Sequence, residues 1–187
     1  MFDVYAFSTP NSVKVLIALE ELDLDYRLHG VNVRLGEQKS ADFLALNPNA
    51  RIPVLVDSSA DGHRLVLTES AAILVYLSEK TGKLLPASGE ARFRTFEQLF
   101  FHASGLSPSF GQAGFFQRQA TAPQPLAIER FSNEAVRTLR VLNGVLANRQ
   151  FVAGENFTIA DIAHFGWLWR REFAGVTLGS GPINVLN

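Results

Sequence analysis

Two neighbouring residues, Glu69 and Ser70, carry side chains that can hold the two charged groups of one amino acid. They stand where a strand pattern changes into a helix pattern, so the free N–H groups of a helix start lie beside them. Those N–H groups and the Ser70 hydroxyl can bind a carboxylate, and the Glu69 carboxylate can bind an ammonium group. The alternative is structural, because an N-cap and a first-turn acid also stabilise a helix.

A second polar cluster, Ser8-Thr9-Pro10-Asn11, precedes the first helix pattern. Thr9 suits an N-cap, and Pro10 suits the first helical position, where its missing N–H does no harm. Ser8, Thr9 and Asn11 can each donate a hydrogen bond to a thiolate, and a helix N-terminus lowers a thiol pKa from its usual value of about 8.5. The chain has no Cys, so such a thiol must belong to a ligand. The alternative is that Thr9 and Asn11 only start the helix.

The composition excludes several classes of function. Lys and Arg number 17 and Asp and Glu 18, so the overall charge gives no basis for binding nucleic acid or an anionic membrane. Without Cys there is no disulfide framework, iron–sulfur cluster or Cys-based zinc site, and the scattered His residues predict no other metal site. The first residues do not form a signal peptide, and no apolar run is long enough to span a membrane. We therefore expect a cytoplasmic protein.

The first half of the chain alternates between strand and helix periodicity. The expected elements are a strand at 2–7, a helix at 11–22, strand 25–33, helix 40–46, strand 52–57, strand 64–68 and helix 69–80. Strand, helix and strand within about thirty residues form a βαβ unit with parallel strands. Asp61-Gly62 is a strong turn signal between the last two strands. The pattern predicts an α/β domain at 1–83.

The second half, after a linker at 84–89, shows no convincing strand pattern. Helices are expected at 91–103, at 126–146 and from 158 through 173, with glycines and a proline interrupting the stretch from 105 to 114. Thr158 and Asp161 have the spacing of a capping box. Four aromatic residues can line an acceptor pocket or pack in the core: Phe101, Phe110, Phe115 and Phe116. The pattern predicts an all-helical domain at 90–187.

Three motifs in this order resemble the cytosolic glutathione transferases over nearly the whole chain. They are Ser8-Thr9-Pro10-Asn11, Arg51-Ile52-Pro53-Val54 and Thr68-Glu69-Ser70-Ala71-Ala72-Ile73-Leu74. The helix starts look most like the bacterial Nu class and its fungal Ure2-like relatives. The resemblance implies a thioredoxin-like N-terminal domain, a helical C-terminal domain, glutathione as co-substrate and a homodimer. Similar proteins usually continue through further helices beyond the position of Asn187, so the helical domain is either truncated or naturally short.

The resemblance also implies a role for each polar residue at the two helix starts. Thr9 and Asn11 would donate to the glutathione thiolate, and Ser8 is the rival of Thr9 for that role. Glu69 and Ser70 would hold the γ-glutamyl end of glutathione.

The remaining expected contacts lie on loops and on one helix. By resemblance, Pro53 follows a cis peptide bond, and the Ile52 backbone pairs with the cysteinyl part of glutathione; the alternative is a trans proline on an edge strand. Gln38 and Arg51 match positions that contact the glutathione backbone, although such loop residues are usually solvated. Arg130 resembles a helical arginine that reaches glutathione, in some relatives from across the dimer, and its alternative is a surface ion pair.

The expected function is that of a glutathione transferase or disulfide-bond reductase. A thiolate held by hydrogen bonds would attack an electrophilic carbon or a disulfide. Because the chain has no Cys, disulfide reduction would use glutathione itself as the reductant, two molecules per site. The alternative is a non-catalytic binding or regulatory protein with the same fold.

Overall fold

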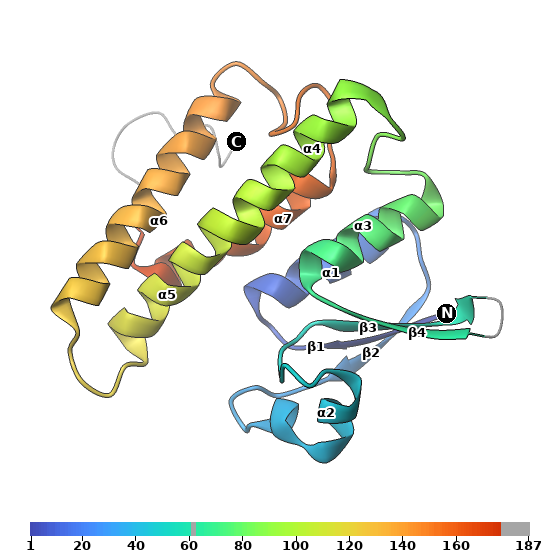
Figure 1. Ribbon diagram of the computed structural model, residues 1–187, viewed down its shortest axis with the longest axis horizontal. Helices are drawn as coiled ribbons and strands as arrows, with labels where there is room; N and C mark the ends of the chain where they lie inside the picture. The colour runs from blue at the N-terminus through green and yellow to red at the C-terminus, as the bar shows by residue number, and fades with distance from the viewer. Residues whose placement is uncertain (61–62, 177–187) are drawn as a thin grey trace. The chain divides into compact units, whose positions relative to one another are not determined.

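The computed structural model describes residues 1–60 and 63–176 (Figure 1). Its internal contacts divide the chain into two units, Met1–Leu85 and Pro86–Asn187. The turn predicted at Asp61-Gly62 and the chain end from 177 onward lie outside the described residues.

The first unit is built on a four-stranded sheet with the order β2-β1-β3-β4. The strands are β1 (Phe2–Ala6), β2 (Tyr26–Gly30), β3 (Val54–Ala60) and β4 (His63–Thr68). As predicted, β1 and β2 are parallel; β3 is antiparallel to both β1 and β4. The strand predicted at 25–33 is shorter in the structure, because the Asn32 side chain accepts a bond from the Arg34 N–H and turns the chain after Val31.

Three helices complete the first unit: α1 (Pro10–Glu21), α2 (Ala41–Leu46) and α3 (Ser70–Thr81). Helices α1 and α3 contact each other on one side of the sheet, and α2 lies on the other side (Figure 1). The core between sheet and helices is fully buried at Val4, Val15, Leu19, Leu55 and Leu74. This is the predicted thioredoxin-like arrangement, and it brings the start of α1, the start of β3 and the start of α3 to one end of the unit.

The second unit is helical in its described part, apart from one bridge between Phe151 and Gly154. Its helices are α4 (Gly89–Phe101), α5 (Ser107–Arg118), α6 (Pro125–Leu146) and α7 (Ile159–Leu168). Their core includes Leu106, Phe110, Ala135, Leu142 and Trp167, so Phe110 is a core residue. The capping box at Thr158 and Asp161 is present as predicted.

The predicted interruption at 105–114 is wrong, because α4 continues through a π-helical turn, His102–Leu106, directly into α5. Pro108 is the second residue of α5, directly after the π-helical turn. A Cβ at Gly114 would clash with the ring of Phe173, and one at Gly111 would lie 3.5 Å from Trp167. Gly114 therefore lets Phe173 approach the helix, whereas the 3.5 Å distance at Gly111 is an ordinary contact that a Cβ would tolerate.

The helix predicted from 158 through 173 is also shorter, since α7 ends at Leu168 and a 3₁₀ turn follows at Arg171–Ala174. The Arg118 guanidinium donates to the carbonyl oxygens of Glu172 and Phe173 at 2.6 and 2.8 Å. Gly175 then takes the left-handed conformation that ends the turn.

Candidate functional site

A hollow of about 240 Å³ opens in the first unit, where segments far apart in the sequence meet. It is lined by Asn11, Asn47, Arg51, Ile52, Pro53, Glu69 and Ser70. Every one of these except Asn47 is a residue that the sequence singled out. The hollow is thus the place where the predicted binding residues of the first unit come together.

The start of α3 supplies the charged groups of the hollow. Ser70 is the first residue of the helix, so its backbone N–H is one of those with no partner inside the helix. Glu69 precedes it with φ 66° and ψ 111°, an unusual backbone conformation for a residue other than glycine. The Glu69 side chain makes no capping hydrogen bond to the helix. Its carboxylate therefore stays available to the hollow, next to a hydroxyl and a helix N-terminus.

The loop before β3 forms a second wall and is fastened by Asn47, at the end of α2. The buried Asn47 amide donates to the Arg51 carbonyl oxygen at 2.7 Å and accepts from the Asn49 N–H at 3.0 Å. The Ile52–Pro53 peptide bond is cis, as the resemblance implied. Sequence reasoning missed Asn47, whose only signal was an Asn-Pro-Asn run that also ends a helix.

At the start of α1, the structure separates Thr9 from Asn11. Thr9 is the N-cap: its hydroxyl oxygen accepts from the Ser12 N–H at 3.4 Å, and its hydroxyl donates to Ser12 Oγ at 3.0 Å. Thr9 thus fits the structural alternative, and Ser8 is exposed. Neither Ser8 nor Thr9 is among the residues that line the hollow, whereas Asn11 is.

The Asn11 side chain has a buried partner that sequence reasoning missed. Lys14 Nζ donates to Asn11 Oδ1 at 2.7 Å, and Lys14 is only 2% exposed. Burial lowers the pKa of Lys14 to about 7, although the Glu69 carboxylate acts in the opposite direction. The sequence signal was weak: Lys14 lies among the apolar positions of α1, where a lysine usually extends to solvent.

Two predicted contacts lie away from the hollow's lining. Gln38 is on a 3₁₀ turn, Glu37–Lys39, and its buried Oε1 has no hydrogen-bond partner within the described residues. Arg130 belongs to the second unit, where it is 68% exposed on α6 and pairs with Glu134 at 3.6 Å. Within that unit, Arg130 matches its structural alternative, a surface ion pair.

A larger hollow of about 560 Å³ lies beside β2 and α2, also within the first unit. Its lining includes Tyr5 stacked on His29 with ring centroids 4.5 Å apart, together with Phe43, Glu37 and Asp42. Carboxylates and rings suit an anionic ligand less well than the start of α3 does.

Across residues 1–60 and 63–176, no group of three or more His, Cys, Asp or Glu side chains could hold a metal ion. No helix in that part of the chain has the length and apolar character needed to cross a membrane.

Comparison with known proteins gives consistent matches over both units. The model of the glutathione S-transferase N-terminal domain matches residues 9–80, and that of the C-terminal domain matches residues 115–182. The disulfide-bond oxidoreductase YfcG of Escherichia coli is 44% identical over 176 residues, which cover 92% of this chain and 82% of YfcG.

Two solved structures are similar in fold as well as in sequence. A glutathione transferase family member from Pseudomonas fluorescens, with two glutathione molecules bound, is 40% identical with a TM-score of 0.88, over 93% of this chain and 81% of that one. A glutathione transferase from Pseudomonas putida, with one glutathione disulfide bound per subunit, is 40% identical with a TM-score of 0.86, over 91% and 75%. The chain belongs to the glutathione S-transferase family.

Proposed function

We propose that this chain is a glutathione-dependent enzyme. The thiolate of bound glutathione would either be conjugated to an electrophilic carbon or reduce a disulfide. The observation that carries the proposal is the hollow in which Glu69, Ser70, Ile52 and Asn11 converge. The Glu69 carboxylate would bind the γ-glutamyl ammonium, while Ser70 and the start of α3 would bind its carboxylate. The Ile52 backbone would pair with the cysteinyl part. Gln38 and Arg51 would contact the rest of the tripeptide.

Catalysis would depend on stabilising the thiolate by hydrogen bonds, without a base from the protein. Asn11 lines the hollow in the first turn of α1, so its amide and the N-terminus of that helix are the donors that we assign to the thiolate. Donors placed where the negative charge resides lower the thiol pKa and raise the thiolate fraction at neutral pH. The thiolate then attacks an electrophilic carbon and displaces its leaving group, or attacks a disulfide sulfur.

Disulfide reduction is the reaction we favour between these two. The first thiolate attacks one sulfur of the disulfide, whose S–S bond breaks and releases the other sulfur as a thiolate. A second glutathione thiolate attacks the mixed disulfide, which gives oxidised glutathione and the second substrate thiolate. Two glutathione molecules thus supply the two electrons, with no Cys from the chain. The relatives support this stoichiometry, since one is named an oxidoreductase and the others hold two glutathiones or one glutathione disulfide.

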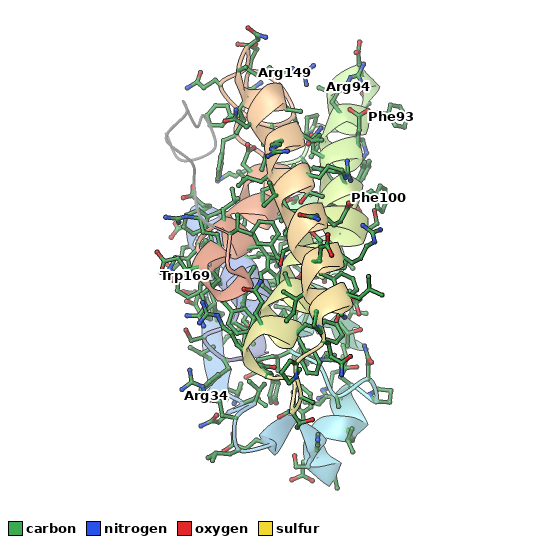
Figure 2. All side chains as sticks on the ribbon, turned by 90° about the vertical axis from the view of Figure 1, so that its left-hand side faces the viewer. Arg34, Phe93, Arg94, Phe100, Arg149 and Trp169 are labelled. Atoms are coloured by element: carbon green, nitrogen blue, oxygen red, sulfur yellow. The ribbon has the colours of Figure 1, made fainter. Side chains whose placement is uncertain are left out.

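We also propose a cytoplasmic homodimer of the Nu or Ure2-like kind. Helix α4 carries two exposed aromatic residues one heptad apart, Phe93 at 72% and Phe100 at 65% exposure. Both rings project from α4 on the side away from α6 (Figure 2). A second copy would bury this apolar face, and Arg130 of that copy is the residue we expect to reach glutathione. Sedimentation should show a species near twice 20.6 kDa, and F93E/F100E should shift it to the monomer.

The function is tested by titration with reduced and with oxidised glutathione in a calorimeter, followed by two steady-state assays at equal glutathione. We expect binding of both forms, and faster reduction of a small model disulfide than conjugation to a chloronitrobenzene. Faster conjugation would reverse the preference between the two reactions. Binding without turnover in either assay would favour the alternative, a regulatory protein that keeps the fold and the ligand.

A further inference from the structure

We propose that Lys14 is a positioning residue, which holds the Asn11 amide so that its NH₂ group faces the glutathione sulfur. The inference rests on the proposed function and adds a residue to it. Lys14 is not among the residues that line the hollow, so it acts through Asn11 and not on the ligand directly.

The orientation of the Asn11 amide follows from the chemistry of its partner. An ammonium group has three donors and no acceptor. In its protonated form, Lys14 Nζ, at 2.7 Å, can be bonded only to the amide oxygen, which places Asn11 Oδ1 as the inner atom. The Asn11 side chain also lines the hollow. Its NH₂ group, a donor on both hydrogens, is then the end left for a negatively charged sulfur.

The burial of Lys14 stabilises this orientation of the Asn11 amide. The lysine follows Asn11 by three residues on α1, so both side chains lie on one face of the helix. Helix α1 contacts α3, and Lys14 is 2% exposed. With water largely excluded, turning the amide over would place its two N–H donors against the ammonium and break the bond from Lys14 Nζ to Oδ1.

The charged group that acts on Lys14 from outside α1 is Glu69, at the start of α3. The other charged side chains of α3, Glu79 and Lys80, stand at its far end, and Glu20 and Glu21 stand at the far end of α1. Lys14 thus donates to a neutral amide, and it also feels a carboxylate that the ligand would use. Removing the Lys14 charge should leave Glu69 at least as able to bind the γ-glutamyl ammonium.

The test is a double-mutant cycle of Lys14→Met and Asn11→Ala in the full chain. Three quantities are measured: the dissociation constant of reduced glutathione, kcat with a model disulfide, and the pKa of the bound thiol from thiolate absorbance. We expect K14M to raise the bound-thiol pKa and to lower kcat by up to about tenfold, no more than loss of the Asn11 amide itself. The glutathione dissociation constant should stay within about threefold or become tighter. Lys83→Met, which removes an exposed lysine, is the matched control and should change none of these.

The double variant separates positioning from other roles of Lys14. If the lysine acts through Asn11, K14M should have less than about a twofold further effect on kcat and thiol pKa in the N11A background. Additive effects, or an unchanged thiol pKa in K14M, would overturn the inference. Lys14→Gln, which keeps an N–H donor without the charge, should recover part of kcat. If the wild-type chain fails to bind glutathione, the proposed function fails first, and that result is obtained before any variant is made.

Discussion

Two buried ionisable side chains in the first unit, those of Asp57 and Lys14, differ in the kind of hydrogen-bond partner they have. Asp57 in β3 is fully buried and accepts hydrogen bonds from Tyr76 Oη at 2.6 Å and Lys80 Nζ at 2.7 Å. It therefore has a partner of opposite charge on α3. Lys14 on α1 is buried almost as completely, and it donates a hydrogen bond at 2.7 Å to a neutral amide, that of Asn11.

This difference in partners affects the pKa values of Lys80, which pairs with Asp57, and of Lys14. The hydrogen bond to Asp57 raises the pKa of Lys80 above its ordinary value. Burial lowers the pKa of Lys14 to about 7, and the Glu69 carboxylate opposes this lowering only in part. Lys80 thus stays charged across the physiological range and ties β3 to α3. A lysine whose pKa burial lowers this far is more typical of functional sites than of structural ion pairs.

The largest expected effect is on the structural pair. Asp57→Asn should lower the free energy of unfolding by about 3–4 kcal/mol, because Tyr76 and Lys80 lose the charged acceptor that Asp57 holds in the buried sheet. Since the Lys80 side chain is 34% exposed, water can solvate part of it, which keeps the loss at the lower end of that range. Urea unfolding measures the loss, and Tyr76→Phe, which removes one donor, should lose about 1 kcal/mol. A stable D57N protein would mean that the pair contributes little to the fold.

The next expected effect is on glutathione affinity and leaves the free energy of unfolding nearly unchanged. Ser70→Ala should weaken glutathione binding by roughly 1–3 kcal/mol, the effect of losing a charge-assisted hydrogen bond. Its free energy of unfolding should change little, because the Ser70 hydroxyl is not the cap of α3. Calorimetric titration measures the affinity, with the exposed Ser8→Ala as the matched control. Unchanged affinity in a folded S70A protein would remove the γ-glutamyl assignment.

The third expected effect is a substitution in the core that raises the free energy of unfolding, whereas most core substitutions lower it. Between pH 7 and the ordinary lysine pKa of 10.5, the unfolded chain binds a proton at Lys14 that the folded chain does not. Stability therefore rises with pH in this window, and the full penalty of burying the charge applies below pH 7. Lys14→Met should thus stabilise the protein at pH 6, and its advantage should shrink as pH approaches 10.

We expect K14M to gain about 2 kcal/mol at pH 6, less than the whole pKa shift implies, because the variant loses the bond to Asn11. Urea unfolding at a series of pH values measures the difference. A gain that does not depend on pH would contradict the assigned cause, since better packing alone would act equally at every pH.

The parts of the fold that depend on local pattern could be predicted from the sequence. The βαβ unit, the Thr9 cap and the start of α3 follow from residue periodicity and capping within a few residues. The run from Gly105 to Gly114 could not be predicted, because Gly114 is required by Phe173, which is far away in the sequence. In the first unit, Lys14 and Asn47 were missed for a similar reason: only the assembled fold buries them against their partners.

The smallest expected effect separates the two residues that start α1. Asn11→Ala should lower kcat for disulfide reduction by about tenfold with little change in glutathione affinity, because its amide matters mainly for the thiolate. Thr9→Ala should instead act mainly on stability, with a loss of about 1 kcal/mol, because the Thr9 hydroxyl exchanges hydrogen bonds with Ser12. Single-turnover kinetics at saturating glutathione, together with urea unfolding of both variants, distinguish the two effects. If Thr9→Ala lowers kcat more than Asn11→Ala does, while both proteins stay folded, the hydroxyl must leave Ser12 for the thiolate when glutathione binds, and Thr9 would replace Asn11 as the main donor.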